Sequence, residues 1–290
     1  MSDQKVINKL KNIVGKRHII INSLRKQPFT KGWRYGRGEA VAVVKPGTLL
    51  EIWKVLQICV DEEIIIIMQA ANTGLTGGST PYGNDYDRQV LIINTMRIKD
   101  IHVIKEGKQV VGLTGSTLYE LEKILKPYGR EPHSIIGSTS IGASIVGGVC
   151  NNSGGSLVQR GPAYTELALY AKINQKGQLE LVNELDIDLG SNPEEILNNL
   201  QNKKYNVEDI KHTNKLASDD KYSKIVREIN KKTPARFNSD PRLLYAASGS
   251  AGKLAVFAVR LDTYLSPLKT KVFYLGSNNP DVFWKIRREI

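Results

Sequence analysis

Short apolar runs alternate with amphipathic helical patterns along the first part of this 290-residue chain. The runs Ala40–Val44, Ile64–Met68 and Val90–Asn94 predict buried β-strands. Thr48 precedes apolar residues at three-to-four spacing that begin at Leu49, which predicts a capped amphipathic helix between the first two strands. Because Ile64–Met68 has no polar interruption, we expect this strand in the middle of an α/β sheet.

Two hairpins are predicted farther along the chain. Ile101–Ile104 and Gln109–Leu113 flank the turn-forming residues 106–108, and Leu167–Ile173 and Leu179–Val182 flank a second such turn. Between the two hairpins, Thr117 is the expected N-cap of a further helix. The pattern therefore changes from strand–helix alternation to antiparallel pairing.

The last hundred residues mix polar and apolar segments. Residues 192–232 are polar with one helical pattern at Pro193–Leu200, and they predict a surface insertion. Leu254–Leu261 predicts a buried strand, and Lys271–Leu275 predicts the start of a new strand–helix unit. The final helical pattern, from Pro280, reaches Ile290 without a Gly, Asn or Pro to end it. We expect the chain to be a fragment of something longer.

Two glycine-rich segments carry the chemistry. Met68–Thr80 follows a predicted strand, and Gly137–Gly148 is followed by Cys150–Gly155. Glycines allow close approach of the backbone to a ligand, and Ser, Thr and Asn add short hydrogen-bonding groups. Backbone N–H groups arranged in this way bind phosphate without a charged side chain. Two such segments predict an extended ligand with a pyrophosphate, namely a dinucleotide.

Two common nucleotide motifs are disfavoured. Neither glycine segment matches the Gly-x-Gly-x-x-Gly fingerprint of the Rossmann fold. Gly249–Lys253 resembles a P-loop, but Leu254 stands where that motif requires Ser or Thr. The predicted role of Gly249–Gly252 is a close backbone turn before a buried strand.

Charge and cysteine content restrict the possible partners and the cellular compartment of the protein. The formal net charge is +12, which is explained equally well by a well-solvated surface or by a functional positive field. In the second case anionic lipid head groups and nucleic acid are the candidate partners. Nucleic acid is the weaker alternative, because the chain lacks an arginine-rich arm, zinc-ligand spacing and interleaved aromatic residues. Cys59 and Cys150 predict free, buried thiols in a reducing compartment. Without an apolar signal core, the start of the chain predicts a soluble or peripheral intracellular protein.

Single titratable residues are less informative. His133 is a candidate for a catalytic or cofactor-linking histidine, but a loop histidine with satisfied hydrogen bonds is the favoured interpretation. His18, His102 and His212 are scattered and predict no metal site.

Longer strings of residues carry a resemblance to known proteins. The order of Ala70–Ser79, Gly137–Ser144 and Asn151–Gly155 resembles the FAD-binding domain of flavoproteins of the vanillyl-alcohol-oxidase (PCMH) type. The match is closer to the quinone-dependent D-lactate dehydrogenases of bacterial respiratory membranes. It rests on the following strings: Gln69–Thr76, Gly83–Arg88, Gly129–Ser134, Cys150–Thr165, Thr233–Arg236 and Ala251–Asp262.

The resemblance implies a fold and a set of cofactor contacts. We expect an α+β FAD-binding domain of two subdomains at residues 1–265, including the polar insertion at 192–232, and the start of a truncated α/β substrate cap at 266–290. Backbone amides of the first segment would hold the FAD pyrophosphate, and residues of the second segment and a late strand would line the ribityl and flavin side. The expected cofactor-binding residues are Ala70, Ala71, Asn72, Thr73, Gly74, Gly78, Ser79, Gly137, Ser144, Gly154 and Val256.

The same resemblance implies an activity and partners. The expected reaction is oxidation of D-lactate to pyruvate, in which hydride passes from C2 to noncovalently bound FAD and electrons pass on to a membrane quinone. The alternative is an FAD-binding fragment of a related 2-hydroxy-acid dehydrogenase that is inactive without its cap. Catalytic residues are expected beyond Ile290, and none is assigned within the chain. The expected location is the cytoplasmic face of the bacterial inner membrane, where an anionic surface would hold the protein peripherally for respiratory electron transport; no metal or nucleic acid is expected.

Overall fold

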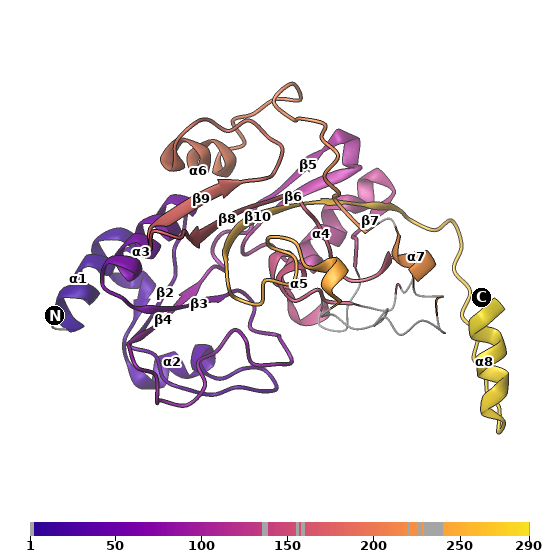
Figure 1. Cartoon of the computed structure of the whole chain (residues 1–290), viewed down its shortest axis with the longest axis horizontal. Helices are drawn as coiled ribbons and strands as arrows, with labels where there is room; N and C mark the ends of the chain where they lie inside the picture. Colours follow the sequence, from indigo (N-terminus) through magenta and orange to yellow (C-terminus); the bar gives the residue numbers. More distant parts are fainter. Residues whose placement is uncertain are drawn as a thin grey trace.

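The computed structural model describes residues 3–134, 139–154, 157, 160–219, 221–225, 228 and 240–289. Its strands form a four-stranded sheet, a five-stranded sheet and a two-stranded ribbon, with helices packed on both larger sheets (Figure 1). This mixed architecture agrees with the predicted α+β fold of two subdomains and excludes one doubly wound parallel sheet.

The first sheet has the strand order β1-β2-β4-β3. Its strands are β1 (Ile19–Ile20), β2 (Ala42–Val44), β4 (Val90–Asn94) and β3 (Ile65–Gln69). The strands β2, β4 and β3 are parallel, and β1 pairs antiparallel with β2. Helix α3 (Leu49–Asp61) connects β2 to β3, and the predicted cap is present, since Thr48 Oγ1 accepts a 3.1 Å hydrogen bond from Glu51 N.

The predicted central position of β3 is wrong. β3 is an edge strand whose residues are mostly half-buried, whereas every residue of β4 is buried. An apolar run indicates that both faces of a strand are at least partly covered. It carries no information about the order of the strands in a sheet.

The second sheet is antiparallel, with the order β5-β6-β10-β8-β9. Its strands are β5 (Ile101–Ile104), β6 (Gln109–Leu113), β10 (Ala255–Asp262), β8 (Ala168–Ile173) and β9 (Leu179–Asn183). Both predicted hairpins are confirmed, as β5–β6 and β8–β9. The register shifts between Val256 and Ala258, and this β-bulge places the consecutive residues Phe257 and Ala258 in one core cluster.

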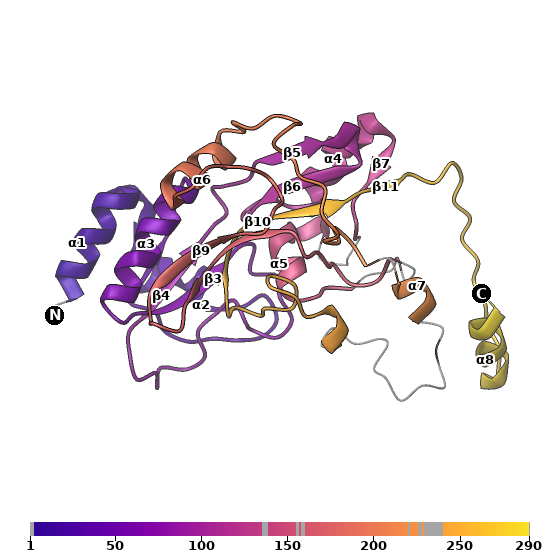
Figure 2. The same cartoon turned by 45° about the horizontal axis from the view of Figure 1, so that its top comes forward.

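Alternate strand residues face different cores. Leu91 and Ile93 of β4 pack in the main core with α1 (Asp3–Val14), α3 and α6 (Pro193–Gln201), and one face of the second sheet contributes to the same cluster. Val90 and Ile92 pack on the opposite face, next to Phe29 of α2 (Ser23–Thr30). Helices α1, α3 and α6 lie together on one side of the first sheet, and α2 lies on the other (Figures 1 and 2).

The prediction of a surface insertion at 192–232 is wrong for its first part. Leu197 and Leu200 of α6 are fully buried, and Tyr205 and Ile210 also belong to the main core. The helix itself was predicted, but its single apolar stripe, which is the usual pattern of a helix that covers a core, was not used to predict burial.

The other face of the second sheet is covered by α4 (Leu118–Leu125) and α5 (Ile145–Cys150). Thr117 caps α4 as predicted and forms a capping box with Glu120. The turn predicted at Gly249–Gly252 is present and packs on the end of α5, where Gly249 N donates to Val149 O at 3.0 Å.

The end of the chain departs from prediction. The two-stranded ribbon pairs β7 (Arg130–Glu131) with β11 (Tyr264–Leu265), but residues 271–275 form no strand. An apolar extended segment becomes a strand only with a hydrogen-bonding partner. Helix α8 (Pro280–Glu289) forms as predicted and stands apart from the body of the molecule in both views (Figures 1 and 2).

The remaining helical turns are short. They are η1 (Lys16–His18), η2 (Lys105–Gly107), η3 (Lys126–Tyr128), η4 (Thr139–Ile141), α7 (Tyr222–Ile225) and η6 (Pro241–Leu243). Among the described residues, no helix combines the length and apolar character that crossing a membrane requires.

Candidate functional site

The first glycine segment is anchored by a buried amide. Gln69 ends β3 and is 1% exposed; its Nε2 donates to Phe29 O at 2.8 Å and to Ser79 O at 2.7 Å. Asn94, at the end of the neighbouring strand, donates through Nδ2 to Gln69 Oε1 at 3.1 Å and to Ala70 O at 3.1 Å. These bonds hold both ends of the segment at the carboxyl edge of the parallel sheet, where ligands of α/β sheets commonly bind.

Asn72 shapes the middle of the segment. It has a left-handed backbone conformation (φ 56°), which Asn adopts more easily than most residues. Its Nδ2 donates to Lys31 O at 2.8 Å, and its Oδ1 accepts from Ser79 Oγ at 2.7 Å. Asn72 therefore closes the segment into a loop and ties that loop to the chain near Lys31.

The loop presents unpaired donors. From Ala71 to Ser79, no backbone N–H donates a hydrogen bond within the described part of the chain. A Cβ added at Gly74 or Gly78 would meet no atom within 4 Å, so both glycines border open space. Free N–H groups beside side-chain-free positions are what a pyrophosphate requires. The predicted residues of this segment thus fit a dinucleotide.

A basic turn forms the wall beside this loop. Lys31 pairs with Arg37 across the turn, and Gly36 (φ 91°) packs so closely that an added Cβ would lie 2.4 Å from Thr80 Oγ1 and 3.0 Å from Gly77 Cα. Residues 69–83 contain no charged side chain. The exposed Lys31, Arg34 and Arg37 therefore supply positive potential next to the loop. Sequence reasoning missed this turn, although its glycines at 32, 36 and 38 are a signal of close packing.

The second glycine segment meets the first through a short junction between the sheets. Thr95 N donates to Gln69 O at 2.8 Å, and Thr95 Oγ1 donates to Thr114 O at 3.2 Å. Ile145 N, in the second segment, donates to Ser116 O at 3.0 Å. Gly115 lies between these bonds, where a Cβ would stand 2.2 Å from Thr95 O. The structure thereby connects the two segments that the sequence separates by about sixty residues.

The predicted residues of the second segment differ in their placement. Ser144 is the N-cap of α5 and accepts from Gly147 N at 3.1 Å through Oγ, which leaves its hydroxyl hydrogen for another acceptor. Val256 of β10 packs in the same core cluster as Ile145 and Val149 of α5. Gly154 is exposed at the far end of the segment. Gly137 lies outside the described residues.

Both cysteines are free, as predicted; Cys59 is buried, whereas Cys150 is half-buried. Both thiols remain protonated at neutral pH. Burial raises the pKa of the Cys59 thiol to about 12 and that of the Cys150 thiol to about 11, in the second case against a smaller lowering by Ser250. Neither cysteine is activated as a nucleophile.

The favoured interpretation of His133 was a loop histidine whose hydrogen bonds are all made. This is wrong for the ring nitrogen Nδ1. The side chain is 6% exposed, and Nδ1 has no hydrogen-bond partner among the residues that the structure describes. Burial, together with the positive charge of Arg160, lowers the pKa of His133 to about 4. The imidazole is therefore neutral and partly unpaired near the second glycine segment.

His102 offers a matched contrast and a prediction. It is equally buried, but its Nδ1 lies 2.8 Å from Tyr205 Oη, and burial, helped by Lys203, lowers its pKa to about 4. Because the unfolded chain binds a proton near pH 6.5 and the folded chain does not, the stability contribution is complete above pH 6.5 and is lost as the pH falls toward 4. For each histidine we expect the free energy of unfolding to fall by about 3 kcal/mol between pH 6.5 and pH 4.

This pH dependence is measured by urea unfolding at pH 7 and pH 4.5. The variants His102→Gln and His133→Gln should each show a smaller difference between the two pH values than the unsubstituted protein. An unchanged difference in both would contradict burial as neutral imidazoles.

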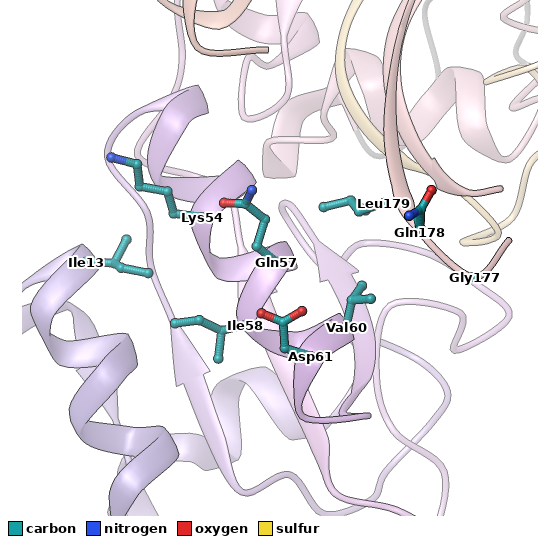
Figure 3. Close-up of a pocket in the computed structure, with 9 residues that line it drawn as sticks. All are labelled: Ile13, Lys54, Gln57, Ile58, Val60, Asp61, Gly177, Gln178 and Leu179. Carbon is teal, nitrogen blue, oxygen red and sulfur yellow. The ribbon is translucent and has the colours of Figure 1, made fainter. Parts of the chain in front are cut away.

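A cavity on another part of the molecule is separate from the two glycine segments. It has a volume of about 700 Å³ and lies between α1, α3 and the β8–β9 turn (Figure 3). Ile13, Lys54 and Leu179 are among its lining residues, and no residue of either glycine segment contributes. Among the described residues, no group of three His, Cys, Asp or Glu side chains is arranged to hold a metal ion.

A match to a family of known proteins follows the geometry of the site. The segment at residues 40–177 matches the family described as FAD binding domain. It contains the first glycine loop, the junction and the whole second glycine segment. The expected cofactor, FAD, is therefore the cofactor of this domain.

The whole chain has closer relatives. It is 58% identical over 290 residues, all of this chain, to the quinone-dependent D-lactate dehydrogenase of Haemophilus influenzae, and covers 51% of that protein. The chain spans about half the length of the curated relatives of this name that it matches. The predicted resemblance is confirmed.

Solved structures support the fold. Alkyldihydroxyacetonephosphate synthase superposes with a TM-score of 0.60 at 14% identity, covering 93% of this chain and 42% of that one. Substrate-bound p-cresol methylhydroxylase superposes with a TM-score of 0.56 at 13% identity, covering 92% and 44%. At such identities the likeness establishes the PCMH-type fold alone.

Proposed function

We propose that this chain is the FAD-binding part of a dehydrogenase that oxidises D-lactate to pyruvate and passes the electrons to a membrane quinone. The observation that carries the proposal is the loop at Ala71–Ser79, whose backbone N–H groups have no acceptor among the described residues, in a chain 58% identical to a quinone-dependent D-lactate dehydrogenase. Bound FAD would supply the two-electron chemistry. The protein would supply binding, orientation and exclusion of water.

The cofactor contacts follow from this proposal. Backbone amides of Ala70, Ala71, Asn72, Thr73 and Gly74, with Gly78 and Ser79, would bind the pyrophosphate. Lys31, Arg34 and Arg37 would add positive potential on the adjacent wall. Gly137, Ser144, Gly154 and the backbone of Val256 would line the ribityl and flavin side.

The domain limits are part of the proposal. Residues 1–265 would form the FAD-binding domain, and residues 266–290 would begin the substrate cap. Helix α8 fits that role because Val282, Phe283 and Trp284 are 40–51% exposed. Catalytic acid–base residues would belong to the remaining half of the length seen in the relatives.

The activity is tested by the visible spectrum of the FAD-loaded protein under anaerobic conditions. D-lactate should bleach the flavin absorption and L-lactate should not. Bound flavin that D-lactate leaves unbleached would favour the alternative, a binding module that is inactive without its cap. A colourless protein with steeply salt-dependent DNA binding would contradict both.

The partners include an anionic membrane surface. Between Asp3 and Glu39 the chain has ten Lys and Arg residues and no Asp or Glu, which suits peripheral binding to the cytoplasmic face of the inner membrane. Cosedimentation with vesicles rich in anionic lipid should fall as salt rises. Equal binding to neutral vesicles would contradict the electrostatic account.

We predict noncovalent FAD. Covalent attachment requires a reactive side chain near the flavin. The Cys150 thiol stays protonated because burial raises its pKa to about 11, and His133 precedes the second glycine segment by several residues. Precipitation with acid should therefore release all flavin into the supernatant. Yellow colour in the washed pellet would contradict this prediction.

A further inference from the structure

Two buried polar side chains follow one another just before the second glycine segment. His133 is 6% exposed and Ser134 is 3% exposed. Within the described part of the chain, neither His133 Nδ1 nor Ser134 Oγ has a hydrogen-bond partner. Buried polar atoms are nearly always paired, because an unpaired one destabilises the fold. Two adjacent exceptions indicate a partner outside the protein chain.

The backbone at this point cannot move easily to relieve the unpaired atoms. Arg130 donates through Nε to Thr263 Oγ1 and through Nη2 to Thr263 O, both at 2.6 Å. Glu131 pairs with Tyr264 in the β7–β11 ribbon. Arg160 donates through Nη1 to Pro132 O at 2.9 Å, forms an ion pair with Glu131 and stacks on the Tyr264 ring at 4.2 Å. The residues that lead into His133 are therefore held by three independent contacts.

Arg160 also locates the pair relative to the second glycine segment. Pro132 precedes that segment and Arg160 follows it, so their hydrogen bond brings its two flanks together. Ser144, between the flanks, is connected to the junction with the first loop through its neighbour Ile145. His133 thus lies beside the segment assigned to the flavin side of FAD.

The imidazole of His133 is suited to a neutral polar ligand. At neutral pH it carries no charge, and its Nδ1 donates or accepts according to the tautomer. The polar edge of an isoalloxazine ring offers both carbonyl acceptors and ring nitrogens. A phosphate would instead favour a charged partner.

We propose that His133, through Nδ1, and Ser134, through Oγ, form hydrogen bonds to the polar edge of the flavin ring and orient it. This inference rests on the proposed binding of FAD. It makes His133 and Ser134 positioning residues that are kept unpaired in the cofactor-free protein for this contact.

The test compares His133→Leu, His133→Asn and the control His102→Leu. In the cofactor-free protein, His133→Leu removes an unpaired buried atom and should leave the unfolding temperature unchanged or raised, whereas His102→Leu leaves the Tyr205 hydroxyl unpaired and should lower it. FAD affinity is measured by the quenching of flavin fluorescence, and here the substitution at position 133 should have the larger effect. His133→Leu should weaken affinity by roughly 10- to 100-fold, and His102→Leu should leave it unchanged.

The variant His133→Asn and the flavin midpoint potential distinguish a hydrogen bond to the flavin from a purely structural role. His133→Asn, whose amide can replace Nδ1, should restore affinity to within about threefold of the unsubstituted protein. The flavin midpoint potential should shift in His133→Leu and return in His133→Asn. Intact FAD binding with no change in His133→Leu would overturn this proposal alone. Failure of the unsubstituted protein to bind FAD would overturn it together with the proposed function.

Discussion

Replacing Gly74 by valine should abolish FAD retention while the unfolding temperature of the cofactor-free protein stays the same. The Cβ of residue 74 would point into open space, and the backbone there does not require glycine, so the fold accepts a side chain. A pyrophosphate on the loop would meet that side chain. Loss of two hydrogen bonds to charged phosphate oxygens, about 1.5–3 kcal/mol each, corresponds to roughly 100-fold weaker binding or more.

A matched control exists in the same chain. Gly276 also borders open space with an ordinary backbone conformation, and it lies outside both glycine segments. Gly276→Val should bind FAD like the unsubstituted protein, and Gly78→Val should behave like Gly74→Val. Calorimetry and a flavin-fluorescence titration measure the two properties. Full FAD binding by Gly74→Val would contradict the loop as the pyrophosphate site.

Replacing Gly115 by alanine should destabilise the fold and weaken FAD binding together. An added Cβ would lie 2.2 Å from Thr95 O and 2.7 Å from Ile98 O, and both are backbone atoms that cannot rotate away. Overpacking against rigid neighbours costs about 3 kcal/mol, which lowers the unfolding temperature by roughly 6 to 12 °C for a domain of this size. The clash falls on the junction that connects the two glycine segments.

The Gly115→Ala variant therefore distinguishes two possibilities: the junction positions the two glycine segments for FAD, or each segment binds FAD independently. If the junction positions the segments, FAD affinity falls even at temperatures where the variant is fully folded. Normal affinity in the folded variant would indicate that each segment binds its part of the cofactor independently. Scanning calorimetry and FAD titration at low temperature give the two readouts.

Local patterns in the sequence were enough to predict most elements and the first loop. Strands, hairpins and the caps at Thr48 and Thr117 depend on neighbouring residues, so they follow from spacing alone. The phosphate-binding role proposed for Ala70–Ser79 is also a local inference, because it depends on the backbone of one glycine-rich segment.

What the sequence did not predict depends on distant contacts. The edge position of β3 depends on strand order, and the burial of Leu197 and Leu200 depends on where α6 docks. The strand expected at Lys271–Leu275 has no partner among the described residues. Whether His133 is satisfied depends on the atoms around it, which a sequence motif does not specify.

We propose above all that this chain holds FAD without a covalent bond. The direct measurement is to incubate the purified chain with FAD, remove free cofactor by desalting and record the visible spectrum and the flavin released by acid. The account predicts a yellow protein with one releasable FAD per chain. A folded protein that stays colourless after this treatment would contradict it.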